Sequence, residues 1–86
     1  AMLLLPNHIP AQSSSQLHVV LPPQYSLADQ IEIALYDMAG ACVARLFDGQ
    51  LPQHDLPLSL PVLPTGMYRC QVQSTSMQSS AVLVVQ

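Results

Sequence analysis

Eight prolines lie along this chain of 86 residues, and they restrict its fold more than any other feature. Proline has no amide hydrogen and its ring clashes with the preceding helical turn, so it ends or kinks helices. At this density, prolines disfavour long helices and leave short extended segments as the regular structure. The sequence therefore predicts an all-β fold.

Runs of strand length lie between the turn-forming residues. Six of them are Leu17 to Leu21, Gln30 to Tyr36, Cys42 to Phe47, Asp55 to Leu60, Met67 to Gln73 and Ser80 to Val85, and Met2 to Leu5 is a candidate seventh. Short strands spaced about ten residues apart favour two sheets that bury each other's apolar faces. We expect an immunoglobulin-like β-sandwich of about seven antiparallel strands.

Two of these runs alternate between apolar and polar residues, with the period of two typical of a sheet buried on one face. In the second run, the positions predicted to point inward are Ile31, Ile33 and Leu35. In the fifth run they are Tyr68, Cys70 and Val72. Cys70 is therefore expected to be a small core residue rather than a reactive thiol.

The opening segment has a different composition from the rest of the chain. Residues 1–16 contain few strand formers after Leu5, and serine and glutamine are concentrated at their end. We interpret residues 1–16 as a short strand and a linker, and residues 17–86 as the β-sandwich. A chain of this length has room for a single core.

Three turn signals separate the predicted strands. In Asp37 to Gly40, the aspartate is suited to accept a hydrogen bond from the amide two residues on, and the glycine to take a positive φ. Asp48 and Gly49 indicate a second turn. In Leu63 to Gly66, proline at the second position and glycine at the fourth fit a type I turn.

Charge and hydropathy exclude two classes of function. Only 8% of the residues are charged, and the net charge is −3. Two basic side chains cannot build the cationic surface that binds a phosphate backbone, which argues against nucleic acid. The longest apolar stretches, residues 1–5 and 81–85, are much shorter than a membrane-spanning helix, so no transmembrane segment is expected. No signal peptide of the Sec type is expected within these residues.

No group of residues in the sequence indicates catalysis. His8, His18 and His54 lie in different segments without a partner at metal-ligand spacing. The carboxylates fall mostly at turns or strand ends, and no nucleophile elbow or phosphate-binding glycine loop is visible. We therefore expect no enzyme activity, no cofactor and no metal. Cys42 and Cys70 lack metal-site spacing, and the sequence leaves open whether they form a disulfide.

The order of the turn motifs is more specific than any single motif. Residues 31–43 contain an apolar strand, a D-x-x-G hairpin from Asp37 to Gly40 and a second strand. Residues 60–68 read L-x-x-L-P-x-G-x-Y, with Leu63, Pro64, Gly66 and Tyr68 as motif residues. Pro6 and Asn7 open the series, and the run Val82, Leu83, Val84 and Val85 ends it. Over nearly the whole chain, this series resembles the C-terminal sorting domain of type IX secretion cargo.

That resemblance implies a β-sandwich at the end of a larger exported protein, acting as an address and catalysing no reaction. The implied partners are the outer-membrane translocon and its shuttle protein, with a cysteine-type sortase that removes the domain. The implied route runs through the periplasm to the outer membrane, the cell surface or the medium. His8, Ala41 and the uncharged final strand depart from the family pattern, and an uncleaved outer-membrane docking domain would account for them.

The final run, Ala81 to Val85, has two interpretations. It is either a central strand buried on both faces, or an edge strand whose free backbone groups can pair with another strand. In the second case it is the predicted contact with the translocon or with a second copy, giving a homodimer. The alternative function is an immunoglobulin-like structural, adhesion or dimerisation module of a surface protein.

Overall fold

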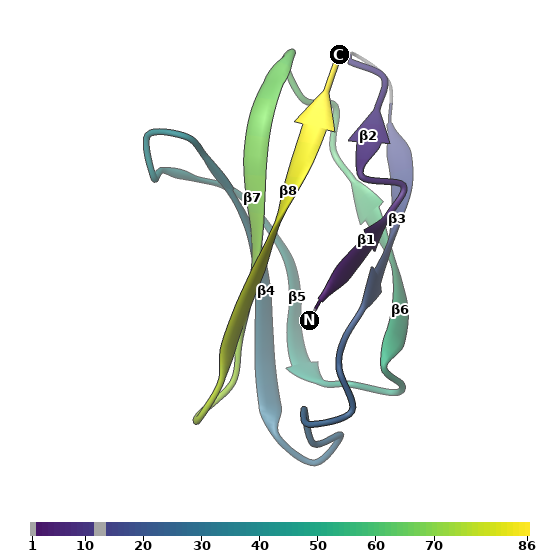
Figure 1. Cartoon of the computed structure of the whole chain (residues 1–86), viewed down its shortest axis with the longest axis vertical. Coiled ribbons are helices and arrows are strands. Elements are labelled where there is room, and N and C mark those ends of the chain that lie inside the picture. The colour runs from purple at the N-terminus through teal and green to yellow at the C-terminus, as the bar shows by residue number, and fades with distance from the viewer. Residues whose placement is uncertain (1, 12–13) are drawn as a thin grey trace.

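The computed structural model describes residues 2–11 and 14–86, and all of its regular elements are strands (Figure 1). They are β1 (Leu3–Leu5), β2 (His8–Ile9), β3 (Ser15–Val20), β4 (Gln30–Asp37), β5 (Cys42–Gln50), β6 (Asp55–Leu60), β7 (Gly66–Gln73) and β8 (Gln78–Val85). The described residues include no helix with the length and apolar character needed to cross a membrane.

The strands form two sheets that pack face to face as a sandwich, with the order β1-β3-β6 in one and β2-β8-β7-β4-β5 in the other. The predicted all-β sandwich is confirmed, although the described chain has eight strands rather than seven. The extra strand is β2, whose two residues are too few to show alternation. β2 also runs parallel to β8, whereas every other strand pair is antiparallel.

The core lies between the sheets and is built from the side chains that alternation predicts. Ile31, Ile33 and Leu35 are fully buried, and Tyr68, Cys70 and Val72 on β7 are buried with them. These two strands are neighbours, with Leu35 opposite Cys70 and Ile33 opposite Val72. Facing them, β3 contributes Leu17 and Val19 from the smaller sheet.

The opening residues contribute to the sandwich. β1 pairs with β3, β2 pairs with the end of β8, and β3 already begins at Ser15. Met2, Leu4 and Ile9 are buried in the core. Residues 2–11 are thus part of the domain that the sequence analysis began at residue 17, and residues 12–13 of the predicted linker lie outside the described residues.

The second predicted turn is wrong, because Asp48 and Gly49 lie inside β5. β5 continues to Gln50 because β4 begins at Gln30 and pairs with it along this whole length. The Gln30 side chain donates a hydrogen bond to Asp48 Oδ1 over 2.8 Å, which ties the two strands together. A cross-strand partner thus overrides the local turn preference of the Asp-Gly pair.

Candidate recognition surface

The D-x-x-G motif forms the hairpin loop between β4 and β5. Asp37 Oδ1 accepts hydrogen bonds from the amides of Ala39, over 3.0 Å, and Ala41, over 2.9 Å. Gly40 has a φ of +90°, a conformation that costs other residues about 1–2 kcal/mol. Both predicted roles are confirmed, since the aspartate satisfies the loop amides and the glycine supplies the left-handed backbone.

The P-x-G-x-Y motif forms the corner where the chain passes from β6 in the smaller sheet to β7 in the larger one. The Tyr68 hydroxyl donates to the Pro64 carbonyl four residues upstream, over 2.7 Å. A Cβ atom added to Gly66 would lie 3.8 Å from the Tyr68 ring, an ordinary contact. Leu63 is buried below the corner. The chain bends at Thr65, and the tyrosine hydroxyl closes the corner.

Pro6 and Asn7 carry the chain from β1 in one sheet to β2 in the other, after a cis peptide bond between Leu5 and Pro6. The Asn7 carbonyl accepts a hydrogen bond from the Val84 amide over 2.9 Å. The Ile9 carbonyl accepts another from Gln86 over 3.0 Å. This segment therefore covers the backbone at the very end of β8.

The motif segments, far apart in the sequence, meet at one end of the larger sheet. Asp37 at the end of β4 lies opposite Tyr68, and Gly66 lies opposite Val85. Asn7 is bonded to the same end of β8. In Figure 1 the β4–β5 loop, the start of β7, β2 and the C-terminus all lie in the upper half of the view.

The last strand is an edge strand for most of its length. Leu83 and Val85 are fully buried, whereas Val82 is 48% exposed and Val84 is half-buried. Within residues 2–11 and 14–86, the side of β8 away from β7 is paired by β2 alone, which reaches Val84 and Val85. The strand is therefore not buried on both faces, and the edge interpretation describes residues 78–83.

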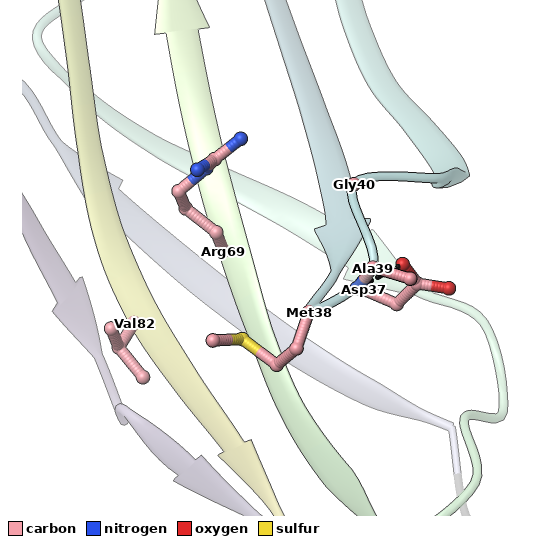
Figure 2. Close-up of a pocket in the computed structure, with 6 residues that line it drawn as sticks. All are labelled: Asp37, Met38, Ala39, Gly40, Arg69 and Val82. Atoms are coloured by element: carbon pink, nitrogen blue, oxygen red, sulfur yellow. Dashed lines mark hydrogen bonds between the residues drawn. The ribbon is translucent and has the colours of Figure 1, made fainter.

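A surface pocket of about 210 Å³ lies beside this edge, on the outer face of the larger sheet (Figure 2). We call it the Arg69 pocket; it is lined by Asp37, Met38, Ala39, Gly40, Arg69 and Val82. The Met38 side chain extends from the hairpin over β7 toward Val82 (Figure 2). Met38 is 67% exposed, and Met67 on the same face of β7 is 50% exposed. Flexible methionines suit a surface that adapts to its partner.

Arg69 supplies the charge of this pocket. Its guanidinium carbon lies 5.8 Å from the centre of the Tyr36 ring, a cation–π distance. Among the described residues, no carboxylate lies within ion-pair distance of Arg69. The Asp37 carboxylate points away from it, toward its own loop amides (Figure 2). The other arginine, Arg45, is paired with Glu32.

Met38, Arg69 and Tyr25 were not predicted from the sequence as functional residues. Arg69 could have been found, because it is one of two basic residues and alternation places it outward. Tyr25 lies in the segment between β3 and β4, where no periodicity reveals burial. Its side chain is nevertheless buried, and its hydroxyl donates to Ser79 Oγ on β8 over 2.9 Å.

The cysteines are free, and the topology explains why. Cys42 on β5 and Cys70 on β7 flank β4, so they are two strand spacings, or about 10 Å, apart. A disulfide requires Cα atoms within about 7 Å. Burial raises the pKa of the Cys70 thiol to about 12, which keeps it protonated and unreactive.

The remaining titratable side chains are dispersed. His18 lies 3.1 Å from Asp55, and the His54 ring hydrogen-bonds the Tyr25 carbonyl over 2.7 Å, whereas His8 is exposed in β2. Across residues 2–11 and 14–86, no three His, Cys, Asp or Glu residues are grouped as metal ligands would be. The β8 edge and the Arg69 pocket present backbone groups, apolar side chains and the Arg69 cation.

The comparisons with known proteins add no relative, since neither a protein-family model nor a curated protein matches this chain.

Proposed function

We propose that this chain is a non-catalytic address domain, which directs an exported parent protein to an outer-membrane translocon of the type IX kind. Its partners in this proposal are the translocon and a shuttle protein, with a cysteine-type sortase where the domain is cleaved. The parent would pass through the periplasm to the outer membrane, the cell surface or the medium.

One observation carries the proposal. The motif segments that resemble the sorting family are separate in sequence, yet they come together at one end of the larger sheet. The connections of a β-sandwich lie at its two ends, and these three motifs share the same end. A shared location supports their use as one surface, with Asp37 and Gly40 on one side and Val82 on the other.

The experiment is a secretion assay in a bacterium that has a type IX system. A signal peptide and a fluorescent reporter are fused ahead of this chain, and surface and medium fluorescence are measured. We expect the wild-type fusion to be delivered, and a fusion lacking residues 82–86 to be retained. Because that deletion also removes the buried Leu83 and Val85, a variant that keeps the core is needed.

Met38→Ser combined with Val82→Ser is that variant, since both side chains are exposed. Leu3→Ser combined with Leu5→Ser is the matched control, because these leucines are equally exposed on the other sheet. We expect the first pair to reduce delivery strongly and the second to leave it unchanged. If a folded wild-type fusion is retained in the periplasm, the chain is not an address domain, and the result favours an adhesion or spacer module.

A further inference from the structure

The open part of β8 presents unpaired backbone groups in a definite pattern. The amides of Val84 and Gln86 point away from β7, since they bond Asn7 and Ile9. Alternate residues of an antiparallel strand point their N–H and C=O groups to the same side. The N–H and C=O groups of Ser80 and Val82 therefore point outward too, beyond the reach of β2. They form a template for one further strand.

Beside this template lies Arg69, which has no carboxylate partner among the described residues. Arg69 lies directly opposite Val82 on β7, so it is one strand in from the open edge. An added strand would lie about 10 Å from the Arg69 backbone, a distance that an arginine and a glutamate side chain span together. Its outward side chain opposite Val82 would enter the Arg69 pocket between Met38 and Val82.

We infer that the open edge of β8 binds an extended peptide segment of a partner protein, which adds as a strand along Ser80 and Val82 and places an acidic side chain against Arg69. This inference deepens the proposed function, on which it rests for the identity of the partner. The backbone template of β8 and the Arg69 charge are present in the folded domain whatever the partner is.

Charge distinguishes this occupant from a second copy of the chain. β8 contains no acidic residue, so a pair of β8 strands would bring no carboxylate to Arg69. Two copies joined in this way would instead place two unpaired arginines on one continuous sheet. Charge complementarity therefore favours an acidic partner segment over self-association.

The test measures binding of a defined peptide to the purified 86-residue chain. The probe is an eight-residue blocked peptide that alternates valine and threonine, with one central glutamate on a threonine position. A second peptide carries glutamine in place of glutamate. We expect the acidic peptide to bind about two- to fivefold more tightly, the range for one exposed charge pair. We expect Arg69→Gln to abolish this preference.

Arg45→Gln is the matched control, because it removes the other arginine of the same sheet and leaves Arg69 intact. It should leave the glutamate preference unchanged. Hydrogen exchange by NMR supplies a second readout that needs no variant. The Ser80 and Val82 amides should become protected when the acidic peptide binds.

Several results would overturn the inference. Equal affinity for the two peptides would contradict the proposed contact between an acidic side chain and Arg69. A preference for the glutamate peptide that survives Arg69→Gln would contradict it as well. Protection of Ser80 and Val82 without peptide, together with a dimeric mass, would assign the edge to a second copy. Because the measurement uses purified protein, it can succeed while the secretion assay fails, or the reverse.

Discussion

The two long edges of the larger sheet are β5 and β8, and they are built differently. The register between β5 and β4 shifts twice along the edge, and Arg45 on β5 is paired with Glu32. β8 keeps an unbroken register with β7 over eight residue pairs, and it has neither proline nor charge. Bulges and charges are the usual devices that prevent strand addition at an edge. β5 is therefore protected, whereas β8 is left open where β2 stops.

The smaller sheet supports the same distinction. Its edge strand β6 carries Pro57 near its centre, and its other edge strand, β1, has three residues. Each of these edges has a feature that hinders pairing. Among the long edges of the described structure, residues 78–83 of β8 lack any such device, as the proposed addition of a partner strand requires.

Thiol reactivity should show the largest difference between the β5 edge and the centre of the sheet. Cys42 is exposed on β5, and Cys70 is buried on β7 with a pKa of about 12 against an ordinary 9.0. At pH 8 we expect iodoacetamide to modify Cys70 roughly a thousandfold more slowly than a thiol with the ordinary pKa of 9.0, because the raised pKa lowers the thiolate fraction by that factor, and far more slowly than the exposed Cys42. Mass spectrometry after timed quenching measures both rates.

The same pKa sets a pH dependence with a definite sign. The folded state holds the Cys70 proton up to a higher pH than the unfolded state, so its contribution to stability is complete below pH 9. That contribution declines as the pH rises from 9 toward 12. In the iodoacetamide experiment, equal rates of modification of Cys42 and Cys70 in the folded protein would show that Cys70 is not buried and that β7 is not a central strand.

Truncation of an inward-facing leucine should give the next largest effect. The loss of stability should differ between the two edge strands β8 and β5. Leu83 on β8 is fully buried, so we expect Leu83→Ala to lower the free energy of unfolding by about 3 kcal/mol. Leu46 on β5 is half-buried where the register shifts, so Leu46→Ala should cost only about 1 kcal/mol. Urea titration measures both. Equal losses would mean that β5 is packed as firmly as β8.

Local rules predicted the parts of this fold that depend on neighbours in sequence. Alternation located Ile31, Ile33 and Leu35 in the core, and Asp37 bonds the amide two residues on, as its side chain suggests. The Asp48–Gly49 turn failed because pairing with β4 prevailed over local preference. Strand pairing joins distant residues, and no periodicity encodes which strands become neighbours.

The sequence predicted the separate motifs of the candidate surface but not their assembly, because it does not specify which strands become neighbours. Each motif could be read from the sequence, but their meeting at one end depends on the order β2-β8-β7-β4-β5. Arg69 was identifiable as a scarce outward cation. Its neighbours across the strands are Tyr36 and Val82, so no described carboxylate lies beside it, and the sequence alone does not specify this pairing.

The smallest expected effect comes from removing the charge pair on β5, and it tests whether this pair or the register shifts protect the edge from strand addition. The Arg45–Glu32 pair is exposed, and such pairs contribute at most about 1 kcal/mol, so Arg45→Gln should change the free energy of unfolding by less than about 0.5 kcal/mol. We also expect the variant to stay monomeric in sedimentation at high concentration, since the two register shifts still distort the edge. Arg69→Gln serves as the charge-matched control. If Arg45→Gln associates while Arg69→Gln stays monomeric, charge rather than backbone shape is what protects the edge of β5 from strand addition.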